Sequence, residues 1–258
     1  VRKAEKAMRT AKNKFYAANA ELEDSRPGYL DALLQEFRDS TFIPYLQPLY
    51  SIQYNRVYGA EVLVRKIDPH GNIQTPVEFI SIMECEHMIS MVDFTMLRQA
   101  CELIQKWKPV WPDIVLNVNF SRNTLMEPDF LEQIDQILSE TGADPAQLIF
   151  EITESSQNIQ LESLCSLLDE VKQRGISLAI DDFGTGLSNL KRFYEINPDS
   201  IKVDSQFTGD IFGTAGKIVR IIFDLARYNR IPVIAEGVES EDVARELIKL
   251  GCVQAQGY

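Results

Sequence analysis

Eight short segments rich in β-branched and aromatic residues recur along the chain, and they limit the possible folds more than any other feature. They cover residues 42–52, 57–67, 114–120, 148–153, 177–183, 200–204, 232–238 and 253–258. From the second segment onward, apolar residues at helical spacing fill the intervals, which predicts helices at 77–107, 123–140, 161–174, 187–195, 215–229 and 240–250. Strands that alternate with helices in this way favour an α/β fold of the TIM-like (β/α)8 barrel type over an open doubly wound sheet.

The beginning of the chain departs from this alternation. Residues 53–56 are too few for a crossover helix, so the first two strands are predicted to be antiparallel. Residues 1–22 have the pattern of a charged, alanine-rich helix without a strand partner, and residues 29–40 that of a second helix, expected to close the bottom of the barrel. We therefore expect a linker helix at 1–25 and the barrel at 26–258.

Composition excludes several classes of function. The formal net charge is −12, and no dense basic run with interleaved aromatic residues occurs, so binding of duplex nucleic acid is not expected. The four cysteines lie far apart and the two histidines lie near neither each other nor a motif, which disfavours zinc sites and disulfides. No apolar stretch reaches the roughly 18 residues of a membrane span. Reduced thiols and a cytoplasmic location are expected, although an anchoring segment upstream is compatible with the sequence.

Polar residues gather at one end of the predicted strands. In a β/α barrel the carboxyl ends of the strands meet around a shared mouth, where reactive groups cluster. Each such residue alone has an ordinary structural explanation, such as a helix cap or a solvated charge. Together the carboxylates would repel one another unless cations lay among them. The polar residues at or near these strand ends are Glu61, Asn117, Glu151, Glu154, Asp181, Asp182, Lys202, Asp204, Glu236, Glu239 and Gln256.

The adjacent carboxylates Asp181 and Asp182 make a metal site more specific. Neighbouring side chains of a regular strand point to opposite faces, so the pair can act together only near a strand end. Oxygen ligands without histidine or cysteine select Mg²⁺, Mn²⁺ or Ca²⁺ rather than zinc. One aspartate could then bridge two metal ions while the other binds one, an arrangement common in phosphoryl chemistry.

These motifs make the chain resemble the EAL-domain cyclic di-GMP phosphodiesterases over residues 42–258. "AEVLVR" stands where the family has Glu-Ala-Leu, and "LNVN", "FEITES", "DDFGTG", "IKVD", "AEGVE" and "QGY" follow in family order. The resemblance implies a barrel with an antiparallel first strand and hydrolysis of cyclic di-GMP to linear pGpG. It also implies two Mg²⁺ or Mn²⁺ ions, with Ca²⁺ inhibitory.

The resemblance further implies roles for individual residues. Lys202, Glu236 and Gln256 would handle the attacking water, with Lys202 or Glu236 as general base, and Glu154 would hold the mobile "DDFGTG" loop. The implied metal ligands are Glu61, Asn117, Glu151, Asp181, Asp182 and Glu236. The implied substrate-binding residues are Gln47, Leu63, Arg65, Asp204 and Glu239, of which Arg65 would contact a phosphate.

Some features depart from the family pattern or reach beyond it. Val62 replaces the family's alanine, Lys66 stands where an aromatic residue is common, and Leu187 replaces a frequent tyrosine. The chain also stops short of the last helix that the family places after "QGY". "AEKAMRTAK" resembles the closing helix of GGDEF-type diguanylate cyclase domains, which suggests an upstream GGDEF-like or sensor domain.

Three hypotheses follow from the sequence. The leading one is a phosphodiesterase, expected to form a homodimer through the barrel. The first alternative is a receptor that binds cyclic di-GMP without cutting it. The second alternative is a dimerisation scaffold, which would leave the ring of carboxylates unexplained.

Overall fold

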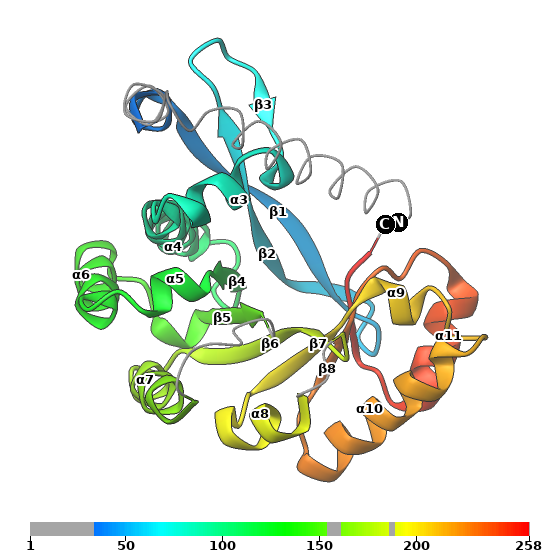
Figure 1. The fold of residues 1–258 in the computed structure, drawn as a ribbon. Helices are drawn as coiled ribbons and strands as arrows, with labels where there is room; N and C mark the ends of the chain where they lie inside the picture. The colour runs from blue at the N-terminus through cyan, green and yellow to red at the C-terminus, as the bar shows by residue number, and fades with distance from the viewer. Residues whose placement is uncertain (1–33, 154–160, 186–188, 258) are drawn as a thin grey trace, which may run out of the picture.

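A computed structural model describes residues 34–153, 161–185 and 189–257 of the chain. The predicted linker helix at 1–25, Glu154 and Leu187 lie outside these residues. Figure 1 shows a ring of strands surrounded by helices.

The strands close into a mixed barrel, which confirms the predicted fold. The ring order is β1-β9-β8-β7-β6-β5-β4-β2, and β1 pairs with β2 to close it. Strand β1 is antiparallel to both of its neighbours, whereas the pairs from β2 and β4 round to β8 and β9 are parallel. The strands of the ring are β1 (Thr41–Ser51), β2 (Arg56–Ile67), β4 (Val115–Phe120), β5 (Leu148–Thr153), β6 (Ser177–Phe183), β7 (Ser200–Val203), β8 (Val233–Ala235) and β9 (Gln254–Ala255). A two-residue strand, β3 (Ile73–Gln74), extends the sheet beside β2 and was not predicted.

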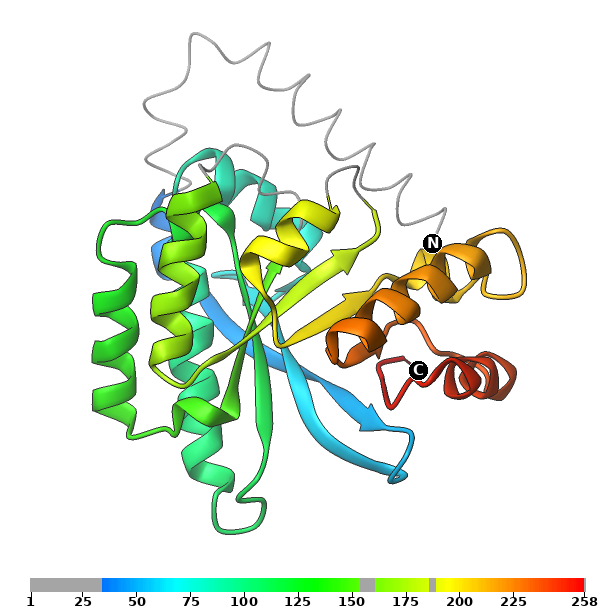
Figure 2. The same ribbon diagram turned by 90° about the horizontal axis from the view of Figure 1, so that it is seen from below.

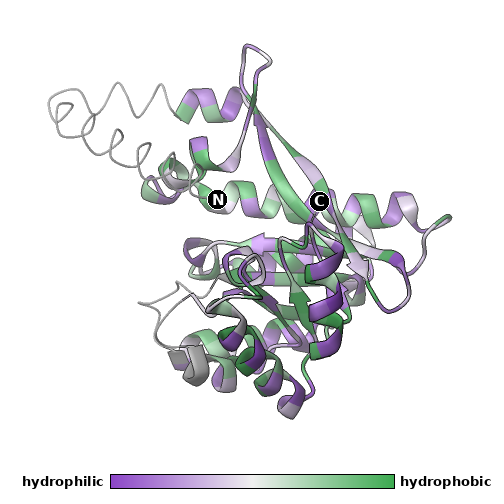
Figure 3. Ribbon diagram, turned by 90° about the vertical axis from the view of Figure 1, so that its right-hand side faces the viewer, coloured by the Kyte–Doolittle hydropathy of each residue, from purple (hydrophilic) through white to green (hydrophobic). Residues whose placement is uncertain are grey.

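The helices lie outside the ring, and Figure 2 shows the green helices α6 and α7 on one side and the orange and red helices α10 and α11 on the other. They are α3 (Pro76–Cys85), α4 (Ile89–Trp107), α5 (Arg122–Leu125), α6 (Phe130–Thr141), α7 (Leu161–Gln173), α8 (Asn189–Ile196), α9 (Ser205–Thr208), α10 (Ala215–Asn229) and α11 (Glu241–Leu250), with a 3-10 turn η1 (Pro145–Gln147) before β5. Figure 3 shows purple and green alternating along these helices, as expected where one face packs on the sheet.

Two predicted helices are each divided in the structure. The segment predicted as one helix over 77–107 breaks between α3 and α4, where His87 has a φ of 55°. A left-handed residue cannot continue a right-handed helix, so α4 starts in a new direction. The segment predicted at 123–140 divides into α5 and α6.

The helix before β1 does not lie where the sequence suggested. Its described part, residues 34–39, contacts Lys66 near the carboxyl end of β2 through Glu36 and Phe37. It therefore packs at the carboxyl end of β2, and the prediction that it closes the bottom of the barrel is wrong. The physical reason is that β1 runs antiparallel, so the chain enters the barrel from the carboxyl-end side.

The core fills the space between the strands and the helices. Phe120 packs edge-on against Phe130 and lies 4.4 Å, between ring centroids, from Phe150. Within the part of the chain that the structure describes, we find no helix with the length and apolar character needed to cross a membrane.

Candidate active site

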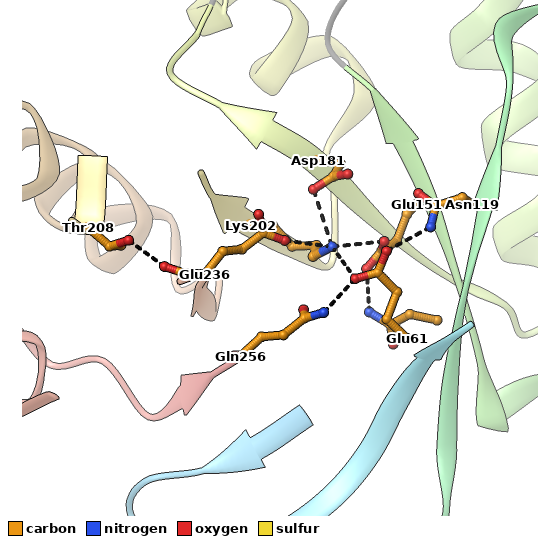
Figure 4. Close-up of polar contacts among 9 residues, drawn as sticks. Glu61, Asn119, Glu151, Asp181, Lys202, Thr208, Glu236 and Gln256 are labelled. Atoms are coloured by element: carbon orange, nitrogen blue, oxygen red, sulfur yellow. Dashed lines mark hydrogen bonds and ion pairs between the residues drawn. The ribbon is translucent and has the colours of Figure 1, made fainter. Parts of the chain in front are cut away.

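The ammonium group of Lys202 occupies the centre of the site (Figure 4). Lys202 lies on β7, a strand buried at all four positions, and its side chain is 1% exposed. Four carboxylates from four other strands or strand ends surround it. Its Nζ lies 2.8 Å from Glu236 Oε1, 2.9 Å from Glu151 Oε2, 3.0 Å from Glu61 Oε2 and 3.3 Å from Asp181 Oδ1.

Amide side chains orient two of these carboxylates. Asn117 donates from Nδ2 to Glu151 Oε1 at 2.6 Å, and Asn119 donates from Nδ2 to Glu61 Oε1 at 2.8 Å. Gln256 donates from Nε2 to Glu61 Oε2 at 2.7 Å. Parallel pairing explains the assembly, because Glu61 lies opposite Asn117 and Asn119 lies opposite Glu151 in the register of the sheet.

A bulge in β6 brings both adjacent aspartates to the site. Ile180 pairs with Ile201 and Phe183 with Val203, so β6 carries one more residue than β7 across this interval. Asp182 takes the left-handed conformation there, with φ of 54°. The bulge breaks the alternation of faces, and oxygens of Asp181, Asp182 and Glu236 lie within 4.8 Å of one another.

Burial and charge pull the pKa values of the central groups in opposite directions. Burial lowers the pKa of Lys202, but Glu151 and the other three carboxylates outweigh it and raise that pKa well above its ordinary value. Burial raises the pKa of Glu61, but Lys202 and the amide hydrogen bonds outweigh it, so the net shift is downward. Lys202 is therefore firmly protonated and Glu61 ionised at neutral pH.

Three carboxyl groups of the site, those of Glu151, Asp182 and Glu236, hold protons more tightly than free carboxylic acids. Burial raises the pKa of Glu151 well above its ordinary value, despite Lys202. Burial, and next the charge of Asp181, raise the pKa of Asp182 to about 7. Burial raises the pKa of Glu236 to about 7 even though Lys202 lowers it. Four carboxyl groups share one ammonium group, so the cluster would carry excess negative charge if all of them were ionised.

Unsatisfied oxygens test whether this cluster suits a cation. Among the described residues, Asn117 Oδ1, Gln256 Oε1 and Asp181 Oδ1 are buried and accept no hydrogen bond, although the last lies near Lys202. Buried oxygens without partners are costly, and a hard divalent cation is the ligand that carboxylate and amide oxygens bind. The donor set therefore fits Mg²⁺, Mn²⁺ or Ca²⁺.

The cluster forms part of the wall of a cavity of about 360 Å³ at the carboxyl ends of the strands. Its lining brings together most residues that the sequence singled out for substrate or water. The lining residues are Gln47, Glu61, Leu63, Asp181, Lys202, Ser205, Glu236, Gly237, Glu239, Gln256 and Gly257.

Two predicted substrate residues lie elsewhere. Asp204 begins α9, where its side chain accepts from the backbone N–H of Gln206 and faces Asp182. Arg65 does not line this cavity; its guanidinium lies over the ring of Tyr45. Asn119, which orients Glu61, was not predicted, although its position two residues after Asn117 on the same face of β4 could have indicated it.

A second cavity of about 550 Å³ adjoins Glu61 between β2, α3, α4 and the end of β4, and apolar side chains such as Val62, Ile80 and Met96 line much of it. The carboxylate of Asp93 also lines it and accepts hydrogen bonds from Thr124 Oγ1 at 2.6 Å and from the backbone N–H of Ser121 at 2.8 Å. Burial raises the pKa of Asp93 to about 6 despite these bonds.

Comparisons with known proteins agree with this geometry. The chain is 53% identical over 215 residues to the probable cyclic di-GMP phosphodiesterase PdeI of Escherichia coli, covering 82% of this chain and 28% of that protein. It is 34% identical over 230 residues to the uncharacterised protein sll1895 of Synechocystis, covering 88% of this chain and 33% of that protein. The chain thus spans about a third or less of the length of these relatives.

Solved structures and a family-wide sequence pattern give the same result. The PaMucR phosphodiesterase in complex with cyclic di-GMP superposes with a TM-score of 0.80 at 27% identity, over 88% of this chain and 94% of that one. The EAL domain of DcpA from Mycobacterium smegmatis superposes with a TM-score of 0.69 at 29% identity, over 83% and 87%. The pattern of the EAL domain matches residues 30–258. This protein chain therefore belongs to the EAL domain family.

Proposed function

We propose that the chain hydrolyses cyclic di-GMP to linear pGpG with the help of divalent metal ions. The observation that carries this proposal is the cluster of carboxylates around Lys202, with buried oxygens left free for cations, in the wall of a cavity. The names of PdeI and PaMucR support the substrate.

The residues proposed to hold two Mg²⁺ or Mn²⁺ ions are Glu61, Asn117, Glu151, Asp181, Asp182 and Glu236. When bound, the ions would offset the repulsion between an acidic protein and an anionic substrate and would lower the pKa of a coordinated water. Asp181 and Asp182 can both contribute because the bulge in β6 turns both toward the site.

The pKa values favour one of the two candidates for general base. In the metal-free site the surrounding carboxylates keep the ammonium of Lys202 protonated, whereas burial raises the pKa of Glu236 to about 7, so Glu236 is the better candidate for taking a proton from the attacking water. Lys202 then stabilises the negative charge that develops on the phosphate as the ribose oxygen leaves. Gln256 would orient the attacking water.

The second cavity offers a place for a guanine base. Its apolar walls can cover the faces of the ring, and the carboxylate of Asp93 can accept hydrogen bonds from donors on its edge. Arg65 and Glu154 keep their proposed roles on a phosphate and on the loop after β6.

Further proposals concern the protein around the barrel. We propose a linker helix at 1–25 that follows a GGDEF-like or sensor domain, a homodimer formed through the barrel, and a cytoplasmic location. Analytical ultracentrifugation of the chain at several concentrations would test the dimer.

The direct test is a turnover assay. Purified protein is incubated with cyclic di-GMP and Mg²⁺ or Mn²⁺, and pGpG is followed by chromatography. Glu61→Gln should abolish the product, and Glu241→Gln, a change at a side chain that is 91% exposed, should not. In Ca²⁺ we expect binding without cleavage, because Ca²⁺ tolerates looser geometry than in-line attack needs. Tight binding without pGpG in any metal would leave the receptor instead of the enzyme.

A further inference from the structure

Tyr45 lies on β1 with its ring against the guanidinium of Arg65. The distance from Arg65 Cζ to the ring centroid is 5.1 Å, within the range of a cation–π contact. Tyr45 is 44% exposed, which is unusual for a large side chain on a strand of the barrel. The ring covers the arginine and leaves much of its own surface open to solvent.

The register of β1 and β2 explains the contact. Tyr45 lies opposite Leu63 and Ile43 lies opposite Arg65, so Tyr45 and Arg65 are diagonal neighbours on the face that Leu63 shares. Leu63 lines the cavity of the active site. Arg65, two residues after Leu63 on β2, therefore extends from the same face of the strand, just beyond the cavity wall.

None of the partners that the structure describes for Arg65 neutralises its charge. Its Nη1 donates to the backbone carbonyl of Val64 at 2.8 Å, and within the described residues it forms no ion pair. An ion pair would orient the guanidinium but would compete with an anionic ligand for it. An aromatic ring orients the group while leaving its donors and its charge available.

We propose that Tyr45 is a positioning residue that holds Arg65 ready for a phosphate group of the substrate. This inference rests on the proposed function and adds to it a residue outside the motifs that identify the family. Tyr45 is expected to act on ground-state binding, because neither Tyr45 nor Arg65 lines the cavity that holds Lys202, and Arg65 would contact the ligand from beyond its wall.

The test compares Tyr45→Leu, which removes the ring, with Tyr45→Phe, which keeps it, each in wild-type and Arg65→Ala backgrounds. Tyr45→Leu should raise KM for cyclic di-GMP about two- to fivefold with kcat unchanged, and Tyr45→Phe should match the wild type. In the Arg65→Ala background Tyr45→Leu should have no further effect. Tyr228→Leu, a change at an 84% exposed tyrosine on α10, is the matched control.

A readout without substrate completes the test. The Nε–Hε resonance of Arg65 should shift by NMR when the ring is removed by Tyr45→Leu but not by the control. The proposal is overturned by equal KM in wild type and Tyr45→Leu, by the same loss in the Arg65→Ala background, or by a loss in kcat instead of KM.

Failure of the proposed function would be recognised separately. If the wild type bound cyclic di-GMP without cutting it, hydrolysis would be wrong and the same variants would test Tyr45 through Kd in Ca²⁺. If the wild type neither cut nor bound it, both proposals would fail, and an unchanged Arg65 resonance in Tyr45→Leu would show that the ring contact itself is absent.

Discussion

Two lysines are buried among the residues that the structure describes, and their surroundings differ in charge. Lys202 has four carboxylates within 3.3 Å of its ammonium group. Lys66, near the carboxyl end of β2, is 2% exposed, pairs with Glu36 at 2.6 Å and lies 4.6 Å from the centroid of the Phe37 ring. The first group has excess negative charge, and the second is balanced one to one.

The difference separates a binding site from a structural contact. A balanced ion pair needs no further charge, so the pair of Lys66 and Glu36 can fasten the helix at 34–39 to β2. Excess negative charge in a buried place is unfavourable until a cation arrives, and it is retained where it performs a function. The pairing also explains how the charge of Lys66 is accommodated at a buried position.

The largest effect is expected for Lys202→Met. It removes the charge aimed at the transition state, so kcat should fall about 10²- to 10³-fold, while cyclic di-GMP still binds in Ca²⁺. In the metal-free variant the four carboxylates would have no ammonium group between them, so the melting temperature should drop. Added Mn²⁺ should restore the melting temperature. Lys249→Met, which removes an exposed lysine, should change neither quantity. Near-normal turnover in Lys202→Met would contradict its assigned role.

Asp181→Asn tests the excess of charge directly. Turnover should fall about 100-fold because a proposed bridging ligand is lost. The metal-free protein should be as stable as the wild type, since one of several repelling carboxylates is removed. Calorimetric unfolding in EDTA beside the turnover assay measures both effects. A strongly destabilised metal-free variant would mean that Asp181 is needed chiefly as a partner of Lys202.

Glu36→Gln tests the balanced pair. The change leaves the buried ammonium of Lys66 with a neutral partner, and the free energy of unfolding should decrease by about 1–3 kcal/mol. Lys66→Met removes both the charge and the need for a partner, so it should cost less. Urea unfolding measures the stabilities, and kcat should stay within about twofold of the wild type. A loss of kcat well beyond twofold in a variant that is still folded would show that the helix at 34–39 contributes to the reaction.

The smallest effect concerns pH. Asp182 and Glu236 have pKa values of about 7 in the folded protein, above their ordinary 3.8 and 4.5. Between those limits the folded metal-free protein binds more protons than the unfolded chain, so these groups make stability fall as pH rises from about 4 to 7. A cation competes with the same protons. The rise in melting temperature caused by Mn²⁺ should therefore be about 2 °C or more larger at pH 8 than at pH 5.5. An equal rise at both values would exclude these carboxyls as ligands.

The sequence was sufficient for features that repeat. The barrel, its antiparallel first strand and the polar ends of the strands follow from periodicity and spacing, because each strand of a barrel repeats the same alternation. The residues that gather around Lys202 could be named in advance, since parallel strands bring their carboxyl ends together.

Features that depend on tertiary contacts could not be predicted. The break at His87 and the bulge at Asp182 each need a single residue with positive φ, which neither histidine nor aspartate signals as glycine would. The pair between Lys66 and Glu36 joins residues 30 positions apart and depends on how the helix before β1 packs. The contact of Arg65 with Tyr45 depends on the register of β1 and β2.

The hydrogen bond from Gln256 to Glu61 has a consequence for folding. It joins residues 195 positions apart, and the neighbouring pairing of β1 with β9 closes the ring. Contacts over such sequence distances form late and slowly, because the intervening chain must first be ordered. During synthesis the carboxylates of β2, β5 and β6 would emerge well before Gln256. The complete site exists only after the last strand has joined the first, so a partly synthesised chain would have acidic ligands but no finished cavity.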